Sequence, residues 1–152
     1  MQKIAKPKMK EGRRKYLTVD EVESLCNASD NNGRYRLRNK TMIMLMFRHA
    51  LRVGEVSELK WSQIDFTHNV LHVNRSKNGI NSAHPIQPDI INNLKELKKN
   101  KKSVYVFCGE RDDKMTTRNI RYILKKLGEE AQLGFSVHPH MFKTWNWILS
   151  SK

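Results

Sequence analysis

The chain has 152 residues, of which 38% are hydrophobic, and this is enough for one domain with a modest core. No apolar run approaches the roughly 20 residues that a membrane-spanning helix needs, and the basic first residues lack the apolar stretch of a secretory signal. We therefore expect a cytoplasmic protein with no membrane partner. Cys26 and Cys108 have no metal-ligand spacing, which predicts two buried thiols and no metal site.

Charge is the most informative bulk property of this chain. Lys and Arg number 29 against 15 acidic residues, giving a net charge of +14. Residues 1–15 predict a basic flexible arm, and the remaining residues still carry a positive net charge. A basic body with a basic arm favours a polyanionic partner, because each neutralised phosphate releases counterions. The arm residues expected to contact nucleic acid are Lys6, Lys8, Lys10, Arg13, Arg14 and Lys15.

The first half of the chain predicts mostly helices. Thr18 and Glu21 fit a capping box, which predicts a helix from Val19 to about Ala28. A loop over 30–33 separates it from a helix over 34–50, which is apolar enough to be buried on most sides. Its methionines are expected to fill the core and not to bind a metal. Leu51-Arg52 interrupts this helix, and a short helix follows over 53–59.

The second half predicts a small sheet and two longer helices. Segments 64–66, 70–73 and 83–86 have the pattern of antiparallel strands, and a loop over 76–82 joins the last two. A helix is expected from Pro88 to the basic run at 98–102, followed by a short strand over 104–107. Thr116 or Thr117 then caps a long amphipathic helix in which Tyr122 is expected to be a packing residue. His138-Pro139-His140 begins a final helix.

One candidate site begins at Arg52, which stands between two helices with Glu55 three residues later. Glu55 can hold the Arg52 guanidinium while its remaining donors face outward, and such a fork suits a phosphate. An ordinary surface Arg–Glu pair fits the local pattern equally well.

Two further features carry potential chemistry. Lys77 lies at the tip of a predicted hairpin, from which a lysine can reach a groove and donate a proton. His140 and Lys143 are three residues apart at a predicted helix start, and therefore on one face, where anions are also attracted. Each feature alone also fits a solvated lysine or a structural histidine.

Together, in this order and at these separations, the three features resemble the catalytic domain of the tyrosine recombinase (phage integrase) family. The resemblance covers about Arg14 to Phe142 and is carried by Ala50-Leu51-Arg52-Val53-Gly54-Glu55, by the lysine hairpin and by His138-Pro139-His140-Met141-Phe142. It is greatest to short integrases of the fimbrial DNA-invertase type. It implies a mainly α fold with a small antiparallel β-sheet (α+β), the DNA breaking-rejoining catalytic-domain fold, incomplete at the C-terminus.

The resemblance also implies a reaction on double-stranded DNA that needs no cofactor. A tyrosine attacks the scissile phosphate, two arginines and a histidine stabilise the transition state, and a lysine protonates the leaving oxygen. By position, Arg52 is the first arginine, Glu55 orients it, Lys77 is the general acid and His140 is the histidine. Arg52, Arg75 and Lys77 are expected to contact DNA.

The chain departs from the family pattern at its end. Lys143 stands where the second arginine is expected, and a lysine keeps the charge without the bidentate fork. All four tyrosines (Tyr16, Tyr35, Tyr105 and Tyr122) precede His140, so no nucleophile is present. We therefore divide the chain into a basic arm over 1–15, a truncated catalytic domain over 16–143 and a tail over 144–152 that is foreign to the family.

The codons that the tail permits suggest how this end arose. Deleting one base near codon 143 can convert Lys143-Thr144-Trp145 into Arg-His-Gly. Tryptophan has one codon, TGG, and in the shifted frame its last two bases begin a glycine codon. The resulting Phe-Arg-His is what the family pattern calls for, so we expect a one-base frameshift in an integrase gene.

Several readings of the function remain open. The leading interpretation is a recombinase-derived domain that binds DNA weakly and cannot cleave it alone. The resemblance implies tetramers on DNA for family members, but we do not expect a stable tetramer of this chain. Alternatives are a non-catalytic regulator occupying recombination sites, and a basic RNA-binding protein of the ribosomal type. A DNA-bound protein would be associated with the bacterial nucleoid.

Overall fold

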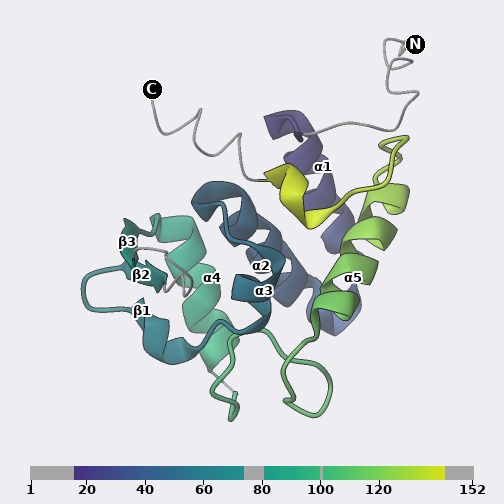
Figure 1. The fold of residues 1–152 in the computed structure, drawn as a ribbon. Helices are drawn as coiled ribbons and strands as arrows, with labels where there is room; N and C mark the ends of the chain where they lie inside the picture. Colours follow the sequence, from purple (N-terminus) through teal and green to yellow (C-terminus); the bar gives the residue numbers. More distant parts are fainter. Residues whose placement is uncertain (1–15, 74–80, 100, 143–152) are drawn as a thin grey trace.

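The computed structural model describes residues 16–73, 81–99 and 101–142 (Figure 1). The predicted arm, Arg75, Lys77, Lys143 and the tail lie outside these residues. The described part is mainly helical with a three-stranded antiparallel sheet, as the sequence predicts. None of its helices is long and apolar enough to cross a membrane.

The first helix, α1 (Val19–Ser29), begins as its capping box predicts. The Thr18 hydroxyl accepts the Glu21 N–H at 3.1 Å, and the Glu21 carboxylate accepts the Thr18 N–H at 2.9 Å. Two of the free N–H groups of the first turn are thereby satisfied. The helix packs against α2 (Arg36–His49). A short 3₁₀ helix, Gly33–Tyr35, comes just before α2.

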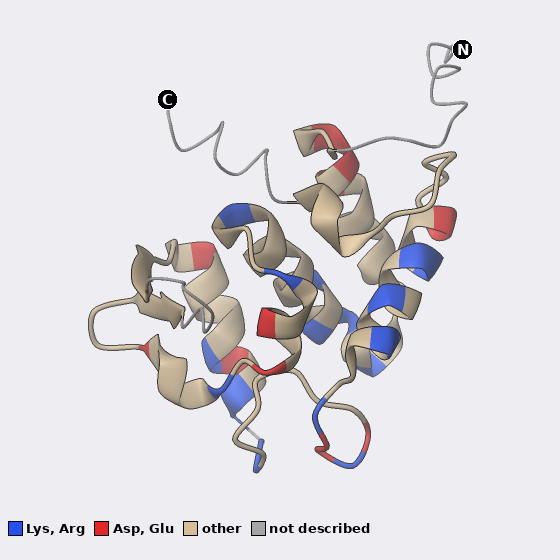
Figure 2. Ribbon diagram, in the orientation of Figure 1, with Lys and Arg blue, Asp and Glu red and all other residues tan. Residues whose placement is uncertain are grey.

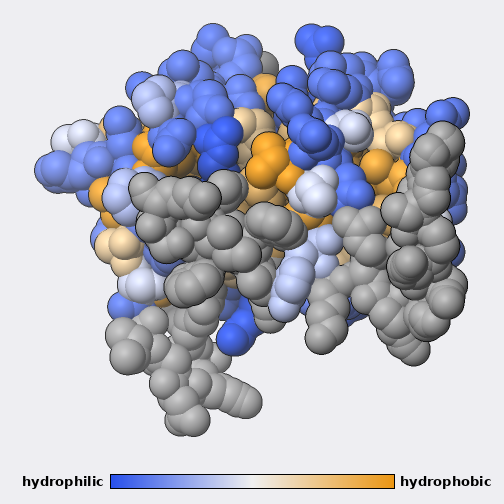
Figure 3. Space-filling model, turned by 90° about the horizontal axis from the view of Figure 1, so that it is seen from above, coloured by the Kyte–Doolittle hydropathy of each residue, from blue (hydrophilic) through white to orange (hydrophobic). Residues whose placement is uncertain are grey.

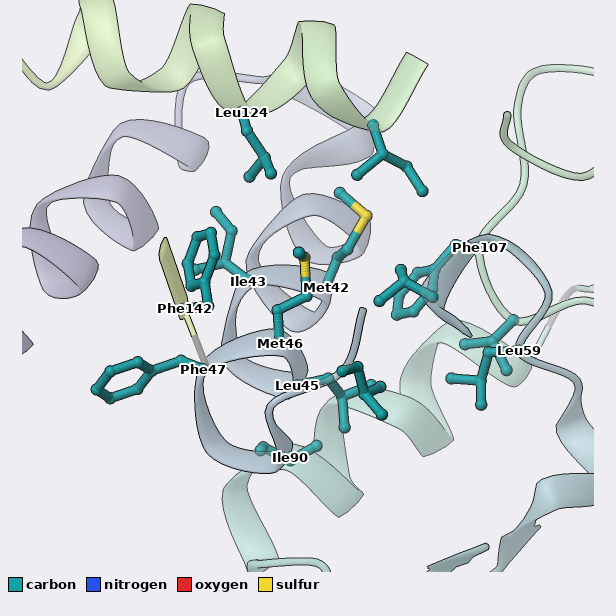
Figure 4. Close-up of a cluster of buried hydrophobic side chains, with 14 of the residues drawn as sticks. Met42, Ile43, Leu45, Met46, Phe47, Leu59, Ile90, Phe107, Leu124 and Phe142 are labelled. Carbon is teal, nitrogen blue, oxygen red and sulfur yellow. The ribbon is translucent and has the colours of Figure 1, made fainter. Parts of the chain in front are cut away.

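Helix α2 is the centre of the fold. Figure 4 shows its side chains directed toward several neighbours, including Leu124 of α5 (Thr117–Glu130), Ile90 of α4 (Pro88–Lys98) and Phe142. Met42 and Met46 are completely buried, so their predicted role as core residues is confirmed. Cys26 and Cys108 are buried free thiols, as expected, and burial raises the pKa of Cys26 to about 11.

The sheet has the order β1–β2–β3, with β1 (Ile64–Asp65), β2 (Val70–Val73) and β3 (Ser82–Pro85). Leu71 and Val73 face the core and His72 faces solvent, because side chains alternate along a strand. β2 pairs with β3 from Val70 opposite Pro85 to Val73 opposite Ser82. The strand predicted over 104–107 is wrong.

At 104–107 the chain forms an isolated bridge in place of a strand. Two backbone hydrogen bonds, from Trp61 N to Val104 O and from Val106 N to Leu59 O, surround the bridge between Lys60 and Tyr105. The pairing stops there because the partner segment turns into a 3₁₀ helix at Trp61–Gln63.

The face of the molecule seen from above is mostly polar where described residues form it (Figure 3). Seen from above, hydrophobic residues reach the surface as separate spots between hydrophilic ones (Figure 3). The large apolar side chains that are most exposed among the described residues include Val19, Val104 and Tyr122.

Candidate functional site

Arg52 owes its position to a sharp break between α2 and α3 (Val53–Ser57). Ala50 adopts the left-handed conformation, with φ 51° and ψ 41°, and so ends α2. Leu51 is buried and fixes this turn in the core, while Arg52 has an extended backbone and an exposed side chain. Local geometry therefore directs the guanidinium away from the core.

Glu55 orients Arg52 through the backbone. Its Oε1 accepts the Arg52 N–H at 2.8 Å, in the manner of a carboxylate at a helix start. The contact expected with the guanidinium is thus replaced by a contact with the main chain. The structure places no carboxylate within ion-pair distance of the Arg52 guanidinium among the residues it describes.

His140 is held by a short 3₁₀ helix, Pro139–Phe142, where the sequence predicts a helix start. Phe142 is completely buried and Met141 nearly so, and the Met141 carbonyl accepts the Leu17 N–H at 3.1 Å. These contacts fasten the segment to the core, and His140 lies on its exposed side. Its ring stacks on that of His138 with centroids 5.8 Å apart.

The structure brings Arg52 and His140 to one pocket, although 88 positions separate them in the sequence. The pocket has a volume of about 180 Å³ and is lined by Arg52, Val53, Arg121, Pro139 and His140. It is bounded by the start of α3, by α5 and by the Pro139–Phe142 helix. Three nitrogen-rich side chains thus line one small cavity.

Arg121 is the residue of this pocket that sequence reasoning missed. The Thr116 cap predicts that α5 exists, and Thr116 Oγ1 does accept the Asn119 N–H at 3.0 Å. That signal cannot show which site the exposed face of α5 borders. Tyr122, expected to pack in the core, is 60% exposed instead, because the helix buries Ile120 and Leu124.

Two contacts hold α5 against α3 and so place Arg121 near Arg52. The Ser57 hydroxyl at the end of α3 donates to the Met115 carbonyl at 2.6 Å, just before α5 begins. Beside it, Lys114 Nζ lies 2.8 Å from Glu58 Oε2, and this hydrogen bond lowers the pKa of Glu58. Ser57 is buried, so its bond also satisfies a polar group in the core.

The helix before Arg52 ends in a buried histidine. His49 is 5% exposed, and its ring meets that of His84 on β3 edge-on, with centroids 5.6 Å apart. Burial, and to a lesser degree the nearby His84 and Arg48, lowers the pKa of His49 to about 4. A neutral imidazole therefore connects the Arg52 turn to the strand that follows the Lys77 segment.

The site residues thus fall into two groups. Arg52, Glu55 and His140 lie around or beside one pocket, whereas Lys77, Arg75, Lys143 and the arm lie outside the described residues. Within residues 16–73, 81–99 and 101–142, no cluster of three or more His, Cys, Asp or Glu residues could hold a metal ion. What the pocket offers is positive charge with hydrogen-bond donors, which suits an oxyanion.

Comparisons with known proteins identify the family of this chain. Residues 15–151 match the model of the phage integrase family. The type 1 fimbriae regulatory protein FimB of Escherichia coli K12 is 28% identical over 137 residues, which cover 86% of this chain and 68% of FimB. The tyrosine recombinase XerA of Pyrococcus horikoshii is 29% identical over 147 residues, covering 93% of this chain and 49% of XerA.

Solved structures show the same fold. The XerA recombinase structure has a TM-score of 0.71 at 23% identity, covering 84% of this chain and 47% of that one. A lambda integrase dimer bound to a COC′ core site has a TM-score of 0.74 at 21% identity, covering 92% of this chain and 53% of that one. This chain therefore spans between about half and two thirds of the relatives it matches, and it belongs to the phage integrase family of tyrosine recombinases.

Proposed function

We propose that these 152 residues form the phosphate-binding part of a site-specific recombinase domain and bind duplex DNA without cleaving it. The observation that carries this proposal is the pocket shared by Arg52 and His140, which segments far apart in the sequence build. A guanidinium and an imidazole around one cavity can bind the non-bridging oxygens of a phosphodiester and stabilise charge that develops on them. The positive net charge of the chain favours the same partner.

Within this proposal, the predicted site residues keep their roles, except that Glu55 acts on the Arg52 backbone and not on its guanidinium. Arg52 and His140 bind the scissile phosphate, Glu55 fixes Arg52 through its backbone N–H, and Lys77 donates the proton to the leaving oxygen. Lys143 supplies a single charge where a second arginine would supply two parallel hydrogen bonds. No tyrosine follows His140 within these 152 residues, and our proposal assigns them DNA binding and no nucleophile.

A nicked suicide duplex tests this proposal in one experiment. We expect binding that weakens steeply as salt rises, and no covalent protein–DNA adduct after denaturation. A covalent adduct would contradict the proposed lack of cleavage, and equal binding to duplex DNA and to an acidic polypeptide would contradict the proposed DNA partner. Adding a structured RNA as competitor separates this function from that of a basic RNA-binding protein.

The predicted frameshift is a separate proposal about the gene. The family match extends through residue 151 and thus includes most of the tail that we predict to be foreign, so the boundary at 143 stays a prediction. Sequencing the DNA beyond codon 143 tests it. We expect the shifted frame to encode a Gly-His segment followed by a tyrosine, and a shifted frame without them would contradict the proposal.

A related lambda integrase structure is a tetramer bound to a Holliday junction. For this chain we propose a lower oligomeric state on DNA, as expected from the sequence. Sedimentation of the chain with a duplex and with a four-way junction checks this, and a stable tetramer on the junction would overturn it.

A further inference from the structure

We infer that Arg121 is a further phosphate-binding residue of the Arg52 and His140 pocket, so that the pocket presents two guanidinium groups to one anion. This inference rests on the proposed function and adds a residue to its site. Arg121 lies on the second turn of α5 and lines the same 180 Å³ pocket as Arg52 and His140.

Arg52 and Arg121 lack an anionic protein partner among the described residues. The described residues that line the pocket include two arginines and a histidine but no Asp or Glu. Neither guanidinium forms an ion pair within the described part of the chain, and the polar contact of Arg121 is a long one, 3.5 Å from its Nη1 to Thr117 Oγ1. Two like charges around one small cavity repel each other, and an anion between them removes that cost.

The charge pattern of α5 opposes the dipole of the helix. The positive end of a helix dipole is at its N-terminus, yet α5 carries Arg118 and Arg121 in its first half and Glu129 and Glu130 in its last turn. Figure 2 shows Lys and Arg along successive turns of this helix. The pattern raises the positive potential beside the pocket at a cost in helix stability, and a bound anion would offset that cost.

Hydrogen bonds and buried side chains fix the part of α5 that carries Arg121. The bond from Ser57 to the Met115 carbonyl and the Thr116 cap fix the start of α5 relative to α3. Ile120 and Leu124 on either side of Arg121 are completely buried, which sets the rotation of the helix. Arg121 is therefore directed to the pocket by the packing of the whole helix.

Inorganic phosphate is the probe for the test, followed by NMR of the arginine side-chain N–H groups in the whole chain. We expect the Arg52 and Arg121 signals to shift with one common midpoint, and the Arg118 signal to shift much less. Arg121→Ala should weaken phosphate binding by about tenfold, since a hydrogen bond to a charged group is lost, and Arg121→Lys should recover part of this. Arg118→Ala, which removes the same charge three residues earlier on α5, is the matched control.

The outcomes separate this inference from the proposed function. If Arg52→Ala weakens binding but Arg121→Ala behaves like Arg118→Ala, the role of Arg121 is overturned and the proposed function stands. If neither Arg52→Ala nor Arg121→Ala changes the midpoint while both proteins keep their unfolding midpoints, both are overturned.

Discussion

The two sides of this molecule differ in whether their charged side chains have partners of opposite charge. On the side of the sheet and α4, charges are paired: Arg48 forms two hydrogen bonds with Asp89 at 3.0 and 3.1 Å, and His68 lies 2.9 Å from Asp65. On the side of the pocket, Arg52 and Arg121 have no carboxylate partner among the described residues. The sheet side thus has an ion pair that joins two helices, whereas the two arginines of the pocket are, in our proposal, presented to an external anion.

The largest expected effect concerns the buried apolar side chain that fastens the His140 segment to the core. Phe142→Ala should lower the free energy of unfolding by about 3–5 kcal/mol, because Phe142 is completely buried and its removal leaves a cavity. Urea denaturation measures this. His140→Ala, on the exposed side of the same 3₁₀ helix, is the control and should change the value by less than about 0.5 kcal/mol. Equal effects of the two variants would show that the segment is not fastened by Phe142.

The free energy of unfolding should depend on pH through His49, which lies where the two sides adjoin. Its pKa is about 4 in the folded chain against an ordinary value of 6.5, so between these values the unfolded chain binds a proton that the folded chain does not. The free energy of unfolding should therefore fall as pH falls from 6.5 to 4, by on the order of 3 kcal/mol, and this contribution should level off below pH 4.

The variant His49→Gln tests this pH dependence. Urea midpoints at pH 7, 6, 5 and 4 should fall more steeply for the parent chain than for the variant. Asp89, whose pKa is lowered by its hydrogen bonds to Arg48, contributes in the same direction in both proteins and so cancels in the comparison. Parallel curves would contradict a buried neutral His49.

On the sheet side, removing a paired charge should destabilise the fold modestly. Asp89→Asn breaks the bidentate contact with Arg48 that joins α4 to α2, and we expect a loss of about 0.5–1 kcal/mol because both side chains are partly exposed. Glu96→Gln, which removes the exposed ion pair with Lys99 on the same helix, should cost only a few tenths. If the Asp89→Asn variant is as stable as the parent chain, ion pairs do not stabilise this side of the molecule.

On the pocket side, removing an unpaired charge should have the opposite effect on stability. Arg121→Gln should raise the free energy of unfolding by a few tenths of a kcal/mol at low salt, because it relieves repulsion from Arg52 and from the helix dipole. The gain should shrink at about 1 M salt, where charges are screened. A destabilised Arg121→Gln protein would mean that Arg121 supports the fold and is not an unpaired charge available to an anion.

Local patterns in the sequence predict much of this fold. Thr18 with Glu21, and Thr116 before α5, mark helix starts that depend only on neighbouring residues, and both predictions are confirmed. The sequence predicts a strand at 104–107, where only the bridge at Tyr105 forms. The length of a strand depends on its partner, and here the partner turns away after Lys60.

The site was predictable only in part, for the same reason. Arg52 and His140 stand in recognisable segments, so the sequence predicts both as site residues. It does not show that they line one pocket. Arg121 could not be named, because its place depends on the contact between Ser57 and Met115, 58 positions apart. The contact of Glu55 was misassigned because spacing alone cannot distinguish the backbone N–H of Arg52 from its guanidinium.

The salt dependence of duplex DNA binding tests the central claim, that the Arg52 pocket binds a DNA phosphate. Fluorescence anisotropy across a range of salt concentrations would compare the parent chain with Arg52→Ala and with Arg36→Ala, an exposed arginine at the opposite end of α2. We predict that Arg52→Ala weakens binding and reduces the slope of log affinity against log salt by about one, while Arg36→Ala leaves both nearly unchanged. Equal slopes and affinities for Arg52→Ala and the parent chain would contradict the claim.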